Sequence, residues 1–432
     1  MPRRILKLAG SAAIVTSLAF VQIPAKLTLQ QAVEMAVKNH PQIQAAQHEV
    51  NFAQQQITIN RAPYYPSVNG EITGSQGNDL SRIGAGELSA SRLFNRFGQG
   101  VEISQLITDS GRTPNLVASA RLQAQASEQN LQATRADIVL QVSRAYYAIL
   151  RAQAVVRVAQ QTVSARQLVN DQVGELAKNK LKSQLDVSFA EVEVSQAKLL
   201  LIRAQEALQA AQAELGRALG SDRPADYVLE ESPLPPGPPG KADDLVAQAM
   251  ANRPELAGLR LSRDSAYKFY EAERDLKRPT VSLAAVGGYI PYINTPANAP
   301  IPAEYEGVAA NVSIPVFNGH LFSARREAAH EHALESDQRL RDQQQQVSRD
   351  VRVAWSGAVT AYQRMDVTAQ FLRQAALSLD LAQGRYNLGL SSIVELTQAQ
   401  LNLTQAEIEN LSAKYDYQTQ YAALQFTIGA LR

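Results

Sequence analysis

An internal duplication constrains this chain more than any other feature. The sequence NHP at positions 39–41 returns as NRP at 252–254, and SQA at 195–197 returns as TQA at 404–406. PSV at 66–68 and LG at 215–216 likewise return as PTV at 279–281 and IG at 428–429. The spacing between these pairs stays between 209 and 213 residues. Several matches in one order indicate two copies of a single structural plan.

A stretch rich in proline and glycine separates the two copies at 232–241. Such a stretch cannot continue a helix or join the interior of a sheet, and we interpret it as a stiff linker. The predicted organisation is a signal peptide over 1–25, a first repeat over 26–231, the linker, and a second repeat over 242–432.

The N-terminus has the pattern of an export signal. Arg3, Arg4 and Lys7 precede a mostly apolar run over 8–24. This run is short for the roughly 20 residues of a membrane-spanning helix, but it suits the core of a cleaved signal peptide. A cytoplasmic N-terminal helix is the alternative. No other window is apolar enough to cross a bilayer as a helix, so a membrane location would require a β-barrel.

The charge balance and the absence of cysteine exclude several classes of function. The 42 basic residues are matched by 41 acidic ones, which argues against a nucleic-acid partner, because phosphate binding needs an excess of Lys and Arg. The chain contains no cysteine. A disulfide scaffold, a thiolate metal site, a cysteine nucleophile and a lipoprotein anchor are therefore excluded.

Each repeat contains a predicted β-hairpin, over 66–108 and over 279–317. Apolar and polar residues alternate in segments such as 68–74 and 308–316, with the period of two that strands show. Each segment is near the roughly 9 to 11 residues that a tilted strand needs to cross a bilayer. A soluble hairpin is the alternative. Aromatic residues gather at the segment ends as in interfacial girdles, with Tyr64, Tyr65 and Phe317 on one side and Phe94, Phe97, Tyr289, Tyr292 and Tyr305 on the other.

A pair of long helices is predicted after each hairpin, over 112–219 and 320–431. Apolar residues recur at alternating spacings of four and three, for example Ile138, Val142, Ala145 and Ile149. This heptad pattern indicates supercoiled helix packing. A helix over 113–177 would be about 95 Å long at 1.5 Å per residue, which a globular core does not need. Turns are expected around 179–183 and 387–392.

Four strands per chain are too few to enclose a pore. The smallest outer-membrane barrels have about eight strands, and open sheet edges are not tolerated in lipid. If the strands are transmembrane, several chains must share one barrel. Three chains supply twelve strands, an even number with an open lumen, whereas the eight strands of a dimer would be filled by side chains.

The order of these elements resembles the TolC-type outer-membrane efflux duct family, the outer membrane factors. The resemblance is carried by 27–33 (LTLQQAV), the turn 385–392 (RYNLGLSS) and 393–396 (IVEL), and it covers the chain from 27 to 432. It implies a fold that is mostly α with transmembrane β. A long, antiparallel, coiled-coil-like α-barrel would cross the periplasm, and four strands per chain would close a 12-stranded barrel in outer-membrane lipid as a trimer.

The resemblance also implies a function and its partners. A homotrimer would form a passive export duct of a tripartite efflux or type I secretion system, docked to a periplasmic adaptor (membrane fusion protein) and, through it, to an inner-membrane pump. The adaptor contacts would come from the tip turns. These positions are Gly389, Leu390 and Ser391 in the second copy and Leu181, Lys182 and Ser183 in the first.

Some members of the family narrow the tunnel with acidic residues just beyond the tip. The matching positions here are Glu395 and Gln398, with Asp186 as the first-copy counterpart of Glu395. A ring of carboxylates around a narrow axis would repel itself and hold cations. The alternative is an ordinary acidic residue in the first turn of a helix, where the helix dipole favours it.

No pattern in the sequence indicates catalysis, a cofactor or a metal site. There is neither a Walker loop nor an H-E-x-x-H motif. His330 and His332 lie two residues apart, on different faces of a helix, and are expected to be surface residues. A soluble periplasmic coiled-coil adaptor or scaffold is the main alternative to the duct, and an enzyme is the second.

Overall fold

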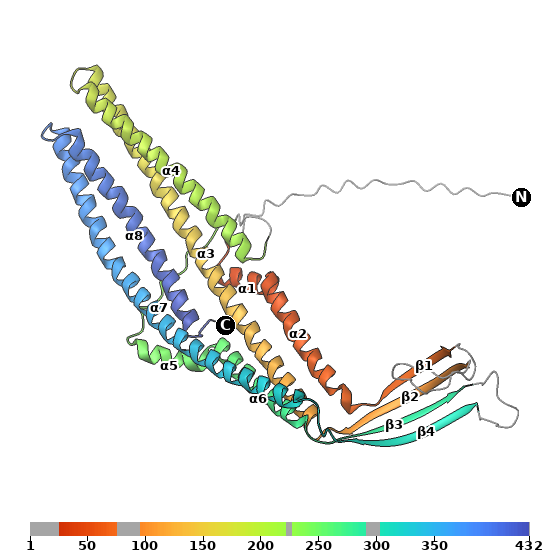
Figure 1. Ribbon diagram of the computed structural model, residues 1–432. Helices are drawn as coiled ribbons and strands as arrows, with labels where there is room; N and C mark the ends of the chain where they lie inside the picture. Colours follow the sequence, from red (N-terminus) through yellow and green to blue (C-terminus); the bar gives the residue numbers. More distant parts are fainter. Residues whose placement is uncertain (1–25, 76–95, 222–226, 291–302, 432) are drawn as a thin grey trace, which may run out of the picture.

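The computed structural model describes residues 26–75, 96–221, 227–290 and 303–431 (Figure 1). The predicted signal peptide over 1–25 lies outside the described residues. The first copy contains α1 (Leu29–Asn39), α2 (Pro41–Arg61), a short 3-10 turn (Ala62–Tyr64), β1 (Ser67–Ser75), β2 (Arg96–Thr108), α3 (Arg112–Lys178) and α4 (Gln184–Ala218). The second contains α5 (Ala242–Asn252), α6 (Pro254–Asp275), β3 (Thr280–Tyr289), β4 (Glu304–Ser313), α7 (Leu321–Asn387) and α8 (Ile393–Thr427).

The two copies match element by element. Helices α3 and α7 each have 67 residues, and α4 and α8 each have 35. Helices α3 and α7 run from the sheet at one end to two turns at the other, and α4 and α8 return alongside them for part of that length (Figure 1). Among the described residues, no helix combines the length and the apolar character needed to cross a membrane.

The helix starts follow local capping rules. Thr28 caps α1 in a reciprocal capping box, in which its hydroxyl accepts from Gln31 N at 3.2 Å and Thr28 N donates to Gln31 Oε1 at 3.1 Å. The equivalent helix α5 begins one residue before the acidic pair Asp243 and Asp244, since its N-cap is Lys241. The two acids lie in the first turn, where the helix dipole favours them.

The four strands form one antiparallel sheet in the order β1-β2-β3-β4. The central pair joins the two copies, with Glu102 opposite Val286. Strand β4 ends at Ser313, whereas the alternation in the sequence continues to Val316. Pro315 follows this end and has no N–H to donate to the ladder.

Register gives the sheet one mostly polar or small face and one mostly apolar face. Because side chains alternate along a strand, paired residues share a face. The first face carries Asn69, Glu71, Thr73, Glu102, Ser104, Ser282, Ala284, Ala309, Asn311 and Ser313, together with the larger apolar residues Leu106 and Val286. The opposite face carries Val68, Ile72, Phe97, Val101, Ile103, Val281, Leu283, Ala285, Tyr289, Val308, Ala310 and Val312, together with the polar residues Gln99, Gln105, Glu304 and Glu306.

Tyr305 lies on the polar face, not beside Tyr289 in an apolar girdle. It pairs with Gly288, which pairs with Gly100 on β2. A Cβ atom added to either glycine would collide with the Tyr305 hydroxyl. The two glycines therefore leave room for the ring to lie across neighbouring strands. Of the other predicted girdle residues, Phe94 and Tyr292 lie outside the described residues.

Across the described residues, the helical core contains three clusters of buried side chains. The largest surrounds Tyr146 and Ile149 on α3 and includes residues of α1, α2 and α4. The second joins α5, α6, α7 and α8 around Val347 and Leu424. The third lies near the tips. The heptad residues Ile138, Val142 and Ala145 are buried as their spacing predicts.

The proline-rich linker is fixed to the helices by hydrogen bonds from large polar side chains. Trp355 Nε1 donates to Pro239 O at 2.8 Å, and the Tyr417 hydroxyl donates to Pro236 O. Gln418 Nε2 donates to Ser232 O at 3.1 Å. The linker is not part of a helix or sheet, so its carbonyls lack regular backbone partners. Each of these bonds gives one such carbonyl a partner.

Candidate functional site: the paired helical tips

The two tip turns have the same backbone structure. Each helix ends with a residue in the left-handed conformation, Lys180 (φ +60°) in the first tip and Gly389 (φ +73°) in the second. In the first tip, Leu181 N donates to Leu176 O at 2.9 Å. In the second, Leu390 N donates to Arg385 O at 2.8 Å. These bonds define a Schellman motif, which satisfies the last carbonyls of each helix.

Serine starts the returning helix in both tips. Ser183 and Ser392 are the N-caps of α4 and α8, and each accepts a hydrogen bond from a backbone N–H three residues later. Ser391, which directly precedes the N-cap of α8, is half-buried. Its hydroxyl has no hydrogen-bond partner among the described residues.

Exposed leucines occupy the same position in each tip. Leu181 is 69% exposed and Leu390 is 67% exposed. Lys182 is half-buried, whereas Ser183 and Gly389 are exposed. The sequence-predicted tip residues therefore gather in two matching turns, and each turn presents an apolar side chain to its surroundings.

The first tip contacts the second hairpin through Tyr386. Lys182 Nζ lies 3.9 Å from the centre of the Tyr386 ring, a cation–π contact. The ring is buried in a cluster with Val173, Ala190 and Leu396, which belong to both hairpins. Burial, and secondarily the nearby Asp186 carboxylate, raises the pKa of the Tyr386 hydroxyl. That hydroxyl has no hydrogen-bond partner in the described part of the chain.

The acidic residues behind the tips have different partners in the two copies. Asp186 Oδ2 accepts from Ser183 N at 3.0 Å and from Ser183 Oγ at 2.8 Å, so its carboxylate completes a capping box. Glu395 Oε1 lies 3.2 Å from Arg385 Nε, across the tip turn. Gln398 Nε2 donates to Asn402 Oδ1 at 3.0 Å. Of these side chains, Glu395 and Gln398 line an open groove between α7 and α8 together with Arg385.

Sequence reasoning missed the two contacts that shape this site. The ion pair between Arg385 and Glu395 joins the last turn of one helix to the first turn of its antiparallel partner. The sequence does contain a signal for this ion pair, because residues at matching distances on either side of a short turn face each other. The Lys182–Tyr386 contact joins segments about 200 residues apart, and no local pattern indicates it.

Long paired helical hairpins attached to one amphipathic antiparallel sheet define the class of the outer-membrane channel proteins. The family model "Outer membrane efflux protein" matches residues 32–221 and 245–430. The chain belongs to the outer membrane efflux protein family. The split match coincides with the two copies.

Individual relatives are distant but cover almost the whole chain. The outer membrane efflux protein BepC of Brucella suis is 23% identical over 90% of this chain and 82% of its own length. The outer membrane protein TolC of Salmonella enteritidis is 21% identical over 93% and 82%. Among solved structures, the outer membrane protein VceC of Vibrio cholerae superposes with a TM-score of 0.78 at 17% identity, covering 93% of this chain and 96% of that one.

Family membership establishes the broad function. The chain is an outer-membrane channel protein of the kind used in tripartite efflux and type I secretion, with a large periplasmic helical part. It transports and does not catalyse, so the enzyme alternative is wrong, and so is the soluble adaptor or scaffold.

Proposed function

We propose that three copies of this chain close one continuous export duct through the outer membrane and the periplasm. The observation that carries this proposal is the sheet. Its β1 and β4 edges have no strand partner among the described residues, and its apolar face includes highly exposed side chains such as Val308 (85%) and Ile72 (74%). Pairing β4 of one copy with β1 of the next removes the open edges, which lipid does not tolerate.

The number of copies follows from the size of the pore. Two copies would give eight strands, whose interior side chains fill, whereas three give twelve strands and an open lumen. The polar face then lines the lumen, and the apolar face contacts lipid. Native mass spectrometry of the detergent-purified protein is expected to show three chains per particle. A monomer or dimer as the dominant species would contradict the proposal.

The tips dock a periplasmic adaptor, which links the duct to an inner-membrane pump. The matching exposed side chains Leu181 and Leu390 support this assignment, because exposed apolar groups at a convex end are typical of contact surfaces. The neighbouring Lys182, Ser183, Gly389 and Ser391 complete the two surfaces. Two relatives are named for different kinds of export, the solvent efflux pump outer membrane protein SrpC and the alkaline protease secretion protein AprF. They align with 92% and 94% of this chain.

Crosslinking tests the docking surface directly. Because the chain has no native cysteine, Leu390→Cys and Leu181→Cys each supply a single thiol. A photoactivatable maleimide on either residue should capture the adaptor in living cells. Ser164→Cys, at an exposed residue of α3 about four helical turns from the tip, is the matched control. Equal capture of the adaptor from this position would refute the assignment.

Asp186, Glu395 and Gln398 form the narrowest part of the tunnel near the tips. The Arg385–Glu395 ion pair modifies the expected acidic ring, because each Glu395 carboxylate has a cationic neighbour at 3.2 Å. Glu395→Ala should lower the block of single-channel current by divalent cations, and Arg385→Ala should raise it. Unchanged block in both variants, recorded in a planar bilayer, would show that these residues do not form the constriction.

A further inference from the structure

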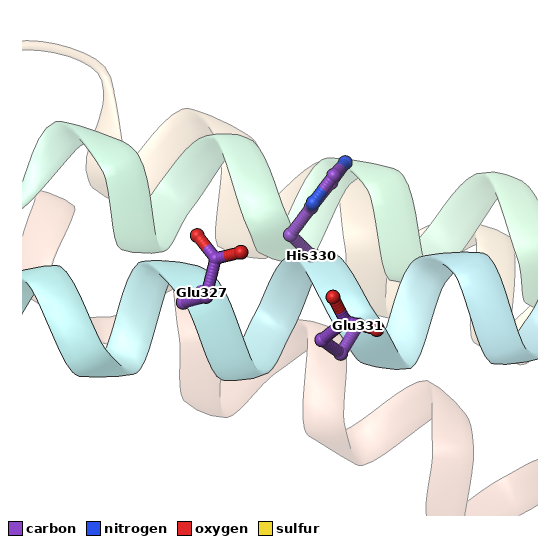
Figure 2. Close-up of side chains that lie close together, drawn as sticks. All are labelled: Glu327, His330 and Glu331. Carbon is purple, nitrogen blue, oxygen red and sulfur yellow. The ribbon is translucent and has the colours of Figure 1, made fainter.

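A second cluster of chemically capable side chains lies near the sheet end of α7, far along the chain from the tips. Glu327, His330 and Glu331 have the spacing i, i+3 and i+4, which places them on one face of the helix. One ligand atom from each side chain lies within 4.8 Å of the other two. Figure 2 shows the three side chains on adjacent turns of α7.

The imidazole in this cluster is held in place by its surroundings. His330 is half-buried, and its ring lies against Tyr270 of α6 with 5.1 Å between ring centres. This contact restricts the ring while leaving its nitrogens without a hydrogen-bond partner among the described residues. A restricted ligand loses less conformational entropy when it binds an ion.

The two carboxylates of the cluster have few cationic or hydrogen-bond partners. Glu327 has one cationic contact, at 4.0 Å from its neighbour Arg326. Glu331 forms no ion pair or hydrogen bond within the described parts of the chain. Two negative charges thus share a small region beside one imidazole, and a divalent cation would neutralise them.

His332, two residues away, differs in each of these respects. Its Nδ1 lies 3.3 Å from Glu335 Oε2, and the same carboxylate pairs with Arg339 at 2.5 Å. The charges around His332 are therefore balanced within the chain. The His330 and His332 pair, two residues apart, does not indicate a metal site, whereas the i, i+3, i+4 spacing of Glu327, His330 and Glu331 does.

We propose that Glu327, His330 and Glu331 bind one divalent transition-metal ion of the Zn²⁺ type. One imidazole nitrogen and two carboxylate oxygens suit such ions, whereas Mg²⁺ and Ca²⁺ prefer all-oxygen sites. Bonds of about 2.0 to 2.2 Å bring the ligand atoms of one ion closer together than 4.8 Å, which rotation of the two exposed glutamates can provide. Water completes the coordination. This site is independent of the proposed adaptor contacts.

Calorimetry on the full-length, detergent-purified protein tests the site. The protein is purified without a histidine tag and freed of metal, and then titrated with ZnCl₂ or MgCl₂. We expect the cluster to bind one Zn²⁺ per chain, and we expect no comparable binding of Mg²⁺. His330→Ala should weaken Zn²⁺ binding at least tenfold, in line with the roughly 10- to 100-fold losses seen even for outer-shell changes. His332→Ala is the matched control and should bind as the unmodified chain does.

The alternative outcomes are distinct. Unchanged Zn²⁺ binding in His330→Ala, or an equal loss in His332→Ala, overturns the proposal. If His330→Ala does not assemble, the double variant Glu327→Gln and Glu331→Gln keeps the side-chain size and must lose binding. X-ray absorption of the bound zinc should show one imidazole ligand per ion, and a spectrum without imidazole would also overturn the assignment.

Discussion

Tyr146 joins three separate segments of the first repeat through one buried hydroxyl. It donates toward Leu27 O at 2.9 Å and Glu230 O at 2.5 Å, so it connects α3 to the segments before α1 and before the linker. Burial, the largest influence, raises the pKa of this hydroxyl to about 12. The group therefore stays protonated, and able to donate, throughout the physiological range.

Removing this hydroxyl should destabilise the chain without changing its shape. Tyr146→Phe deletes the donor and leaves Leu27 O and Glu230 O with fewer partners, a cost of about 1 to 3 kcal/mol. The measurement is the temperature at which the purified protein unfolds by circular dichroism. Tyr362→Phe, at a ring that is 41% exposed, is the control and should have little effect. Equal shifts in the two variants would contradict this role for Tyr146.

Lys180 carries a conformational strain that its counterpart in the second tip avoids. Both residues adopt the left-handed conformation, with φ of +60° for Lys180 and +73° for Gly389. This conformation costs a non-glycine residue about 1 kcal/mol. Lys180→Gly should therefore slow hydrogen exchange in the first tip, and Gly389→Ala should speed it in the second. Faster exchange in Lys180→Gly would show that the lysine side chain stabilises the turn.

Local rules account for single residues at the helix ends, whereas the long-range contacts were not predicted. The Thr28 N-cap and Gly389 after the end of α7 obey capping rules that act within four residues. The same rules could not place Lys180 in the left-handed conformation, because lysine rarely adopts it. The Lys182–Tyr386 contact depends on how two hairpins pack, which no single segment specifies.

Helices α3, α4 and α8 enclose an incompletely paired polar region. Arg166 on α3 is buried, and its Nε lies 3.6 Å from Glu193 Oε2 on α4. Burial lowers the pKa of Arg166 and raises that of Glu193, and in each case the attraction between the two charges opposes the effect. A cavity of about 140 Å³ lies beside Arg166 and is lined by Gln400 and Glu407 of α8.

Glu407 should make the stability of this interface depend on pH. Burial raises its pKa above the ordinary value of 4.5, so the folded protein binds this proton more tightly than the unfolded chain does. The contribution of the neutral carboxyl is complete below the unfolded pKa and is lost as pH rises through the folded pKa. Glu407→Gln should therefore unfold at a higher temperature than the parent at pH 7.5, and the difference should vanish at pH 4.

A matched substitution distinguishes burial at Glu407 from a general charge effect. Glu409→Gln, two residues along α8, removes a carboxylate that pairs with Arg364 at 3.5 Å and is 40% exposed. This variant should not gain stability at pH 7.5. A gain of the same size from both variants would mean that overall charge, rather than burial of Glu407, controls the stability.

The lengths of the elements were easier to predict than the ends of the strands. The heptad pattern predicted helix pairs over 112–219 and 320–431, and the structure begins α3 at Arg112 and α7 at Leu321. A long repeated pattern averages over local exceptions. Strand β4 is short, so the single Pro315 decides where it ends. The side of the sheet on which Tyr305 lies depends on register, which alternation within one strand cannot define.

At the scale of the whole molecule, the two faces of the sheet have different surroundings. Val308 on β4 is opposite Ala285 on the apolar face, whereas the next residue, Ala309, is opposite Ala284 on the polar face. Both are near the middle of the strand. In the proposed trimer, Val308 contacts lipid and Ala309 lines the lumen, although the two are adjacent in the sequence.

A charge introduced at these two positions should therefore have opposite consequences. Val308→Arg places a cation in the lipid, at a cost of about 2 to 4 kcal/mol near the middle of a bilayer, so the yield of assembled protein in the outer membrane should fall. Ala309→Arg should assemble and instead lower single-channel cation conductance, because three added cations face the lumen. Heat-dependent gel mobility measures assembly, and planar bilayers measure conductance. Normal assembly of Val308→Arg together with failure of Ala309→Arg would reverse the two faces of the sheet.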